Sequence, residues 1–364
     1  MDKDIKPYVI TEGYIEDHRT DGLRSGEGCV ASLDDGSLLI IYGRFEGPGD
    51  ADKATLIERR STDGGKRWSR AKALVRPPKD AQNVMSVSLL RLSDGRLAGL
   101  YLLKKSSDYC MPMFMTSDGC GKGWTQPQVT IDRPGYYVVN NDRLVQLSTG
   151  RILIPYCWYN RAAPGPFNGF CGCAMSDDLG RAWRRGAEIQ IQAEHVQRPK
   201  LVDETNPAAL KDVSAGRVAC QEPGVQELLD GRVMMWCRTP GGYAYRALST
   251  DGGQTWGPFE PITDFAMPCG PQSIRRLPGS RRLIMLFNDR GGVPYGHPQF
   301  QWRRPLAIAV SDDDALTWRR HGLLEPDTIP THCYYSICFH QGAVLFTYYE
   351  GVMRATPEGF YVPR

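Results

Sequence analysis

The sequence contains no long hydrophobic run. Its first six residues, Met1 to Lys6, include no apolar core like that of a signal peptide. No later stretch approaches the roughly 20 apolar residues that a membrane-spanning helix needs. We therefore expect no membrane partner and favour a cytoplasmic location. A secreted protein whose signal peptide has been removed would look the same.

Neither sign of charge dominates, and residues that bind metals are scattered. The chain has 44 Lys and Arg against 41 Asp and Glu, a net charge of +3, and no basic run that would indicate nucleic-acid binding. The eleven cysteines include Cys171-Gly-Cys173 but no paired CxxC motif, and His195 and His332 stand alone. We expect no metal and no cofactor, and the odd number of scattered cysteines predicts reduced, mostly buried thiols.

No segment shows sustained helical periodicity, but a short motif recurs. Its most complete copy, Ser249 to Trp256, has the pattern S-x-D-x-G-x-T-W, here called the Asp-box. Ser249 and Asp251 can bond to nearby backbone groups, Gly253 accepts a positive φ, and Trp256 can bury its ring beneath the turn. Copies begin at residues 61, 116, 176, 249 and 311, which are 55 to 73 residues apart. The fifth copy has Ala in place of the glycine, and the second carries one extra residue.

A second repeat, out of phase with the first, consists of a polar turn followed by an apolar strand. Such turns between short apolar runs are typical of β-hairpins. Five of the six hairpins precede an Asp-box, and the sixth comes last in the chain. The pattern predicts an all-β fold, a six-bladed β-propeller with Asp-box turns, as a single domain over residues 1–364. Residues 185–218 form the longest insertion, and whether they cover a cleft is left open. The six turns are Asp35-Gly36, Asp94-Gly95, Thr149-Gly150, Asp230-Gly231, Gly279-Ser280 and Gln341-Gly342.

The Asp-boxes and hairpins resemble those of the sialidase (neuraminidase) superfamily, especially its bacterial branch with BNR repeats. The resemblance covers nearly the whole chain. It implies an exo-acting, retaining glycoside hydrolase that releases a terminal carboxylated sugar, with α-linked sialic acid as the first candidate. A glycan is then the expected partner, and the oligomeric state is not indicated.

Three arginines bind the substrate carboxylate in that superfamily. A planar guanidinium forms two parallel hydrogen bonds to a carboxylate and stays charged at any working pH. The resemblance places these roles on Arg24, Arg238 and Arg303, with Arg304 as the alternative to Arg303. Arg24 is the loosest match, because the family has Arg-Ile-Pro where this chain has Arg24-Ser-Gly.

The loop after the first hairpin supplies the carboxylate that the resemblance implies as acid and base. Asp50 lies six residues after Arg44 and eleven before Ser61, which matches the family's register. Asp52 is the competing choice, and a simple Gly-Pro-Gly-Asp turn is the structural alternative. Arg44 would flank the site, either positioning the loop or contacting the sugar.

In this superfamily a tyrosine replaces the carboxylate nucleophile of other glycosidases. The resemblance implies Tyr335, directly before Ser336, as nucleophile, with Tyr334 as the alternate. Strand alternation puts the two on opposite faces, so that only one can face the cleft. Glu222 fits the base that accepts the phenol proton. Asn141 and Asp142, in a polar run before the third hairpin, are further binding candidates, and a turn accounts for them equally well.

Two other functions fit the same scaffold. One is a sialidase-like hydrolase or lyase for a different sugar, since a fold does not fix its substrate. The other is a catalytically silent propeller that binds glycans or proteins. A binding module has no need for an acid, a base and a phenol at one place, so the Asp50, Glu222 and Tyr335 set distinguishes an enzyme from a binding propeller.

Overall fold

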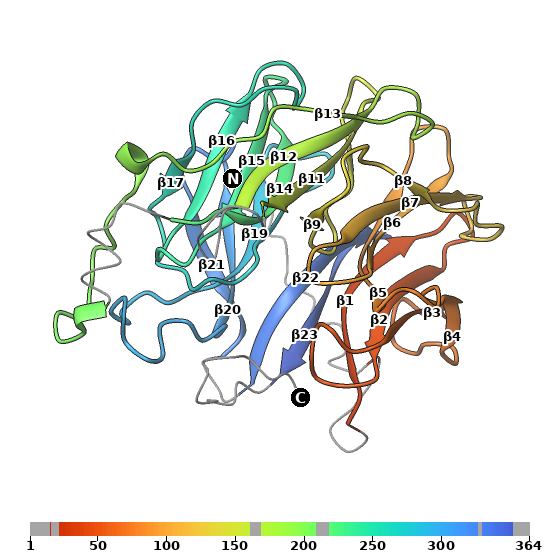
Figure 1. Cartoon of the computed structure of the whole chain (residues 1–364), viewed down its shortest axis with the longest axis horizontal. Coiled ribbons are helices and arrows are strands. Elements are labelled where there is room, and N and C mark those ends of the chain that lie inside the picture. The colour runs from red at the N-terminus through yellow and green to blue at the C-terminus, as the bar shows by residue number, and fades with distance from the viewer. Residues whose placement is uncertain (1–14, 16–21, 161–168, 209–217, 327–329, 352–364) are drawn as a thin grey trace.

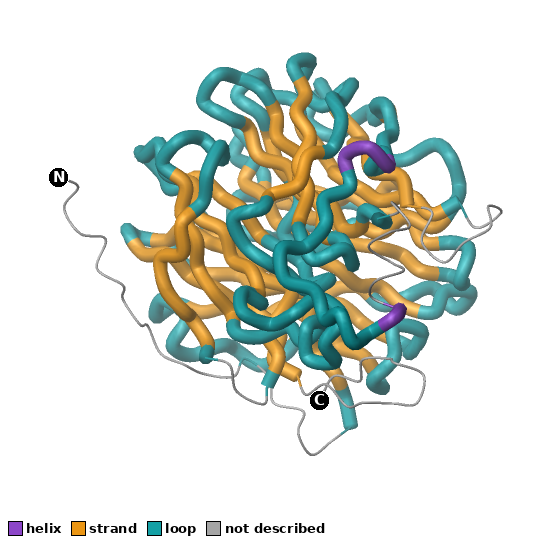
Figure 2. Tube along the Cα trace, turned by 90° about the vertical axis from the view of Figure 1, so that its left-hand side faces the viewer, coloured by secondary structure: helices purple, strands orange, loops and turns teal. Residues whose placement is uncertain are grey.

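The described part of the chain is built almost entirely of β-strands. The computed structural model describes residue 15 and residues 22–160, 169–208, 218–326 and 330–351. These residues form 23 strands, one short 3-10 helix, η1 (Ala193–His195), and a further helical pair, Pro207 and Ala208. Figure 2 shows the strands running through the body of the molecule, with loops at their ends. The all-β class predicted from the hairpins is confirmed.

Hydrogen bonding joins the first thirteen strands into one sheet. Within it, antiparallel strands are linked by two single parallel bridges, Ala54 to Asn83 and Cys110 to Tyr136. The strands of this sheet are β1 (Arg24–Ser32), β2 (Leu38–Phe45), β3 (Ala54–Ser61), β4 (Lys72–Val75), β5 (Asn83–Arg91), β6 (Leu97–Lys104), β7 (Cys110–Ser117), β8 (Gln128–Val129), β9 (Tyr136–Val138), β10 (Val145–Gln146), β11 (Ile152–Tyr159), β12 (Gly169–Ser176) and β13 (Arg184–Arg185).

The remaining strands form three smaller antiparallel sheets. The second sheet is β14 (Gln221–Glu227), β15 (Val233–Arg238), β16 (Ala244–Ser249) and β17 (Glu260–Ile262), in that order. The third is β18 (Ser273–Arg276), β19 (Leu283–Asn288), β20 (Leu306–Ser311) and β21 (Arg319–Glu325), and the fourth is the hairpin of β22 (Thr331–His340) and β23 (Ala343–Gly351). The repeat predicted six separate blades. Among the described residues, the hydrogen bonds define four sheets instead.

The first strand of each later sheet lies against its neighbours. β14 contacts β11 and β18, β18 contacts β22, and β22 contacts β1, which in turn contacts β5. Figure 1 shows the last hairpin, β22 and β23, beside β1 and β2, so that the two ends of the described chain meet. Strands from distant parts of the sequence thus converge on one region.

Apolar side chains fill the spaces between adjacent sheets. Trp236 on β15 and Phe287 on β19 belong to one cluster between the second and third sheets. Val30 on β1 packs in another with Cys338 on β22. Burial of such side chains from water is the main source of stability for these sheets. All eleven cysteines are free, and all but Cys120 and Cys269 are buried, as the scattered cysteines predicted.

Four of the five Asp-box turns share one set of hydrogen bonds. In the fourth copy, the Ser249 hydroxyl donates to Asp251 Oδ1 (2.7 Å) and accepts from the Gly253 N–H (2.8 Å), while Asp251 Oδ1 also accepts from the Thr255 N–H (2.9 Å). Gly253 has a φ of +87°. The copies that begin at residues 61, 176 and 311 repeat these bonds. Each turn therefore satisfies its own backbone donors without help from the rest of the fold.

The Asp251 carboxylate should stabilise the fold at neutral pH. Partial burial raises the pKa of Asp251, but hydrogen bonds from Thr255 and Ser249 outweigh this and lower it to about 2. Because the folded pKa lies below the unfolded value of about 4, the contribution is present above about pH 4 and is lost as the pH falls toward 2. We expect Asp251→Asn to reduce the free energy of unfolding by about 1 kcal/mol at pH 7.

Urea unfolding between pH 3 and 7 checks this expectation, and the difference between variant and parent should shrink below pH 4. Glu204 is exposed on the insertion, so Glu204→Gln is a suitable control and should leave the unfolding curve unchanged. An Asp251→Asn variant as stable as the parent at pH 7 would show that the carboxylate does not hold the turn.

Candidate active site

Four strands that meet in the central region carry the same irregularity. In β1, β5, β14 and β22, two successive residues face a single residue of the neighbouring strand, which is a β-bulge. The first residue of each bulge has a positive φ: Glu27 (54°), Ser86 (57°), Glu222 (47°) and Tyr334 (58°). Such a φ costs a residue with a Cβ roughly 1–3 kcal/mol, and strain of this kind concentrates at functional sites. The four bulges therefore indicate a candidate site.

Glu222 and Arg238 form a buried ion pair at the second sheet. Arg238 Nη2 lies 2.7 Å from Glu222 Oε1. Burial lowers the pKa of Arg238, but the charge of Glu222 outweighs it, so that this pKa is raised and the guanidinium stays charged. Glu222 Oε2 is buried and has no hydrogen-bond partner among the described residues. The pair thus leaves one carboxylate oxygen able to accept a proton.

Arg303 and Tyr334 complete this group. Arg238 Nη1 and Arg303 Nη2 both donate to the backbone oxygen of Cys269, at 3.3 and 3.2 Å. The Arg303 guanidinium lies 5.5 Å from the centre of the Tyr334 ring. Burial raises the pKa of Tyr334 and the Glu222 charge raises it further, whereas the two arginines lower it. The structure thus brings together Glu222, Arg238, Arg303 and Tyr334.

Tyr335, which the sequence favoured for the cleft, lies elsewhere. Its side chain is buried in the apolar cluster between the third sheet and the last hairpin. Its hydroxyl bonds to Asn288 Oδ1 (2.8 Å) and to the His332 carbonyl oxygen (3.0 Å). The preference for Tyr335 rested on the family register, and the bulge between Cys333 and Ser336 interrupts the regular alternation of side chains at this point. Tyr334, the alternate, is the tyrosine beside Glu222.

Asp50 pairs with the first predicted arginine. Arg24 Nη2 lies 2.8 Å from Asp50 Oδ1, and the Arg24 side chain is buried against the Phe45 ring, whereas the Asp50 side chain is 67% exposed. Asn83 Nδ2 and Lys104 Nζ both donate to the Asp50 backbone oxygen, at 2.9 Å each. The loop is therefore fixed at its backbone, while the Asp50 carboxylate reaches solvent.

The competing residues fall into other places. Asp52 accepts a hydrogen bond from the Gly49 N–H (2.7 Å), so it caps its own loop. Arg44 lies on β2, where its backbone pairs with Ser25. The Arg304 guanidinium stacks over Trp302 at 4.1 Å. Arg303, rather than Arg304, is therefore the arginine beside Arg238.

Asn141 and Asp142 are buried and bind the protein itself. Asn141 Nδ2 donates to backbone oxygens of β1 and β22, at 2.7 and 3.0 Å. Asp142 accepts from Arg275 Nη2 (2.8 Å) and from the Ile337 N–H (3.0 Å), and its φ is 56°. These contacts fix the inner strands to one another. The geometry gives both residues a positioning role, and their contact with a sugar stays a prediction.

Glu27 is a site residue that the sequence analysis did not select. It is 8% exposed, and its carboxyl group forms a short hydrogen bond with the Ser86 hydroxyl. Burial and the nearby Asp50 charge raise the pKa of Glu27 to about 7, although the Arg24 charge opposes them. The Glu222 charge raises the pKa of Glu27 further. A carboxyl group that titrates near neutral pH therefore adjoins the predicted residues.

The hairpin repeat contains the signal that would have found Glu27. Glu27, Ser86 and Glu222 each precede a hairpin glycine by nine residues (36 − 27, 95 − 86 and 231 − 222), and Asp142 and Tyr334 do so by eight (150 − 142 and 342 − 334). Aligning the hairpins on their glycines would have grouped these five residues from the sequence alone.

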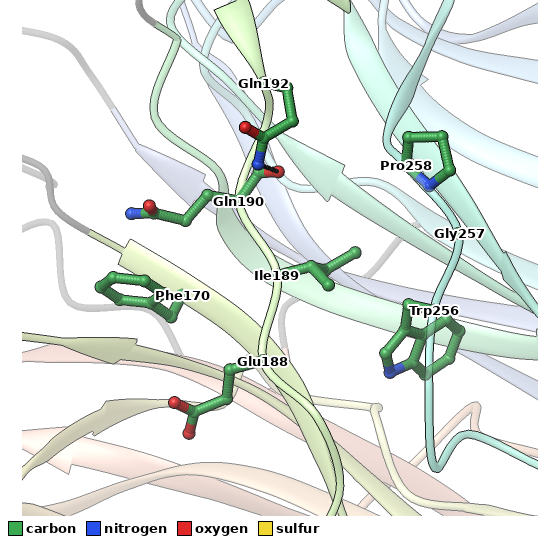
Figure 3. Close-up of a pocket in the computed structure, with 8 residues that line it drawn as sticks. All are labelled: Phe170, Glu188, Ile189, Gln190, Gln192, Trp256, Gly257 and Pro258. Atoms are coloured by element: carbon green, nitrogen blue, oxygen red, sulfur yellow. Dashed lines mark hydrogen bonds between the residues drawn. The ribbon is translucent and has the colours of Figure 1, made fainter.

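A distinct hollow lies away from this group. It has a volume of about 240 Å³ and lies between the segment 188–192 and the turn at residues 256–258 (Figure 3). Phe170 and Trp256 contribute its aromatic faces, and the Glu188 carboxylate accepts a hydrogen bond from the Tyr156 hydroxyl (2.8 Å). None of the residues predicted for catalysis lines it, and it lacks their combination of arginines, carboxylates and phenol. We therefore place the candidate site at the bulges.

A metal-binding cluster or a membrane-spanning helix would each point to a particular kind of partner. Across the described ranges, no three His, Cys, Asp or Glu side chains are grouped as a metal site would require. In the same part of the chain, no helix has both the length and the apolar character needed to cross a bilayer.

Comparison with known proteins places the chain among sialidase-like proteins. The BNR repeat-like domain family matches residues 89–345. The chain belongs to this family. A curated relative, a sialidase from Micromonospora viridifaciens, is 25% identical over 332 residues, which cover 81% of this chain and 45% of the relative. The chain thus spans less than half the length of that sialidase.

Solved structures of similar fold include members with and without an assigned function. A protein of unknown function from Dyadobacter fermentans is 19% identical, with a TM-score of 0.69 over 95% of this chain and 94% of that one. The sialidase of Trypanosoma rangeli in complex with the inhibitor DANA is 14% identical, with a TM-score of 0.66 over 93% and 54%. Hadza microbial sialidase Hz136 is 16% identical, with a TM-score of 0.67 over 87% and 61%. At these identities the likeness establishes the shared fold.

Replacing Glu27 by Gln should change how stability depends on pH. An acid whose pKa rises on folding holds its proton more tightly in the folded state, so its contribution to stability is lost as the pH rises from about 4.5 through about 7. Gln has no such dependence. We therefore expect Glu27→Gln to gain about 2 kcal/mol of unfolding free energy relative to the parent between pH 5 and pH 8.

Chemical denaturation at several pH values measures this gain. A difference between variant and parent that stays constant from pH 5 to pH 8 would show that Glu27 is not a strongly perturbed carboxyl group.

Proposed function

We propose that the chain is an exo-acting, retaining glycoside hydrolase that releases a terminal carboxylated sugar, with α-linked sialic acid as the first candidate. The observation that carries the proposal is the gathering of Tyr334, Glu222, Arg238 and Arg303 at the bulges, with Asp50 exposed nearby. Relatives that are sialidases support the class of reaction. The combination provides a nucleophile, a base, an acid and cations for one anionic substrate.

Arg238 and Arg303 bind the substrate carboxylate in this proposal. Both guanidinium groups donate to one backbone oxygen, that of Cys269, so both can also approach a single carboxylate. Arginine suits this role because its planar fork matches a carboxylate. Arg24 takes part by exchanging partners: a substrate carboxylate at Arg24 displaces Asp50 from its ion pair and frees Asp50 to face the leaving group.

The reaction then proceeds by two displacements. Tyr334 Oη attacks the anomeric carbon while Glu222 Oε2 accepts the phenol proton, and the glycosidic bond to the leaving oxygen breaks as Asp50 protonates that oxygen. Asp50 next removes a proton from water, which attacks the same carbon and releases Tyr334. Glu222 returns its proton to the phenolate. Two inversions give overall retention.

A phenol suits this substrate for an electrostatic reason. The anomeric carbon of a sialoside carries a carboxylate, which repels an anionic nucleophile. Because burial and Glu222 raise the pKa of Tyr334, this phenol is neutral until the base removes its proton. Glu222 has an unpartnered oxygen for that purpose within the described residues.

We also propose that the sheets form six blades around one axis. The strands nearest this axis would be β1, β5, β14, β18 and β22. The contacts between these strands support this arrangement. So does the repeat, since each hairpin glycine follows its inner-strand residue at nearly the same interval. A propeller axis is where side chains from all blades can meet.

A hydrolase or lyase for another sugar is the second candidate. Glu27 favours it, because a buried carboxyl group close to Arg24 adds to the acidic groups of the site. An added negative charge in the cleft alters which acidic sugar binds best, without changing the catalytic set.

Tyr334→Phe and Tyr335→Phe test the assignment as a matched pair. With a fluorogenic α-sialoside, we expect Tyr334→Phe to lose at least about 100-fold in kcat, because the nucleophile is gone. Tyr335→Phe should keep kcat within about threefold, because its hydroxyl bonds to Asn288 and His332 in the core. Asp50→Ala should lose about 100-fold to 10,000-fold for want of the acid.

The same assay distinguishes the alternatives. A large loss in Tyr335→Phe with none in Tyr334→Phe would reverse the assignment of the nucleophile. Absence of turnover by a folded parent would rule out this sialoside as substrate and favour a different acidic sugar. Proton NMR of the first product formed should show the retained anomer.

A further inference from the structure

We propose that Glu27 makes anion binding in this cleft proton-coupled: a sugar carboxylate binds with uptake of a proton by Glu27. The inference rests on the proposed function only in requiring that a carboxylated ligand occupies the cleft. It assigns Glu27 a role in specificity, by setting the charge that the cleft offers to its ligand.

Glu27 already lies near other carboxyl groups before any ligand binds. It is buried, and burial and the charges of Asp50 and Glu222 raise its pKa, although the Arg24 charge opposes them. Arg24 is itself paired with Asp50 at 2.8 Å. A carboxylate ligand at Arg24 would bring a further negative charge close to the buried Glu27, which is unfavourable. Protonation of Glu27 removes that repulsion.

Glu27 is the carboxyl group best placed to take the proton. Glu222 pairs directly with Arg238 at 2.7 Å, and Asp50 pairs with Arg24 at 2.8 Å and reaches solvent. Glu27 bonds instead to a neutral group, the Ser86 hydroxyl. The groups that influence it from the surrounding elements are Arg24 on β1, Asp50 in the loop after β2, Glu222 on β14, Cys110 on β7, Tyr334 on β22 and Tyr349 on β23.

Ser86 suits both charge states of Glu27. A hydroxyl group donates a hydrogen bond to the carboxylate and accepts one from the protonated acid. The hydrogen bond between Glu27 and Ser86 can therefore persist when Glu27 changes its protonation state, whereas an arginine or lysine in place of Ser86 could only donate. The pKa of Glu27, raised to about 7 by burial and by Asp50, means that uptake falls within the physiological range.

Isothermal titration calorimetry with the sialidase inhibitor DANA tests the proposal. At pH 7.5, titrations of the parent in two buffers of different ionisation enthalpy should show uptake of between about half and one proton per ligand bound. Above pH 7, the affinity should fall by up to about tenfold per pH unit. Glu27→Gln should show no uptake and an affinity that is nearly constant between pH 6.5 and 8.5.

Glu58→Gln is the matched control. Glu58 is also a buried glutamate, but it lies on β3 and pairs with Lys72 at 2.7 Å. Its substitution should leave proton uptake by the cleft unchanged. The titration of the parent in two buffers needs no variant, so the proposal stays testable even if Glu27→Gln folds poorly.

The outcomes separate this inference from the proposed hydrolysis. DANA binding without proton uptake, or uptake that persists in Glu27→Gln, overturns the role of Glu27 and leaves the hydrolase proposal standing. Proton-coupled binding of DANA without turnover of any sialoside supports Glu27 and overturns sialoside hydrolysis. If DANA does not bind, D-glucuronate is titrated in its place, and failure of both ligands to bind overturns the inference.

Discussion

The candidate site depends on one backbone constraint, a left-handed residue at the bulge of an inner strand. Glu27, Ser86, Glu222 and Tyr334 all occupy this position, and Asp142 has the same conformation before β10. A regular strand would alternate its side chains between two faces and send every second one into the core. The bulge interrupts that alternation once per strand. It thereby directs a polar or phenolic side chain into the central region while the flanking residues keep their apolar contacts.

Paired charges make this convergence tolerable. An arginine or carboxylate buried without a partner would cost several kcal/mol. Arg238 pairs with Glu222, and Arg24 pairs with Asp50. Glu27 is the exception, since its hydrogen bond is to a hydroxyl, and burial raises its pKa to about 7. The most heavily perturbed carboxyl group is therefore the one without a direct cationic partner, and it is the one whose protonation responds to a ligand.

The Asp-box turns and the inner bulges are stabilised in different ways. The Asp-box turns satisfy their own hydrogen bonds through a serine, an aspartate and the local backbone, as Ser249 and Asp251 do. The inner bulges need neighbours, because Asn141 bonds to β1 and β22, and Asp142 bonds to β18 and β22. Local turns secure the periphery, and long-range contacts between strands secure the region where the candidate chemistry lies.

The sequence by itself determined the all-β class and the hairpin register, because turn residues and strand patterns act over a few neighbouring positions. The grouping of Glu222, Arg238 and Arg303 came from the resemblance to the sialidase superfamily. Only the tertiary structure decided that Tyr334 and not Tyr335 lies beside Glu222, that Glu27 joins the site, and that Asn141 holds strands together. The physical reason is that these outcomes depend on bulges and on pairing between distant strands. A bulge reverses which residue faces the centre, and the alternation of residues within a single strand does not reveal it; a sequence signal emerges only when all the hairpins are aligned on their glycines.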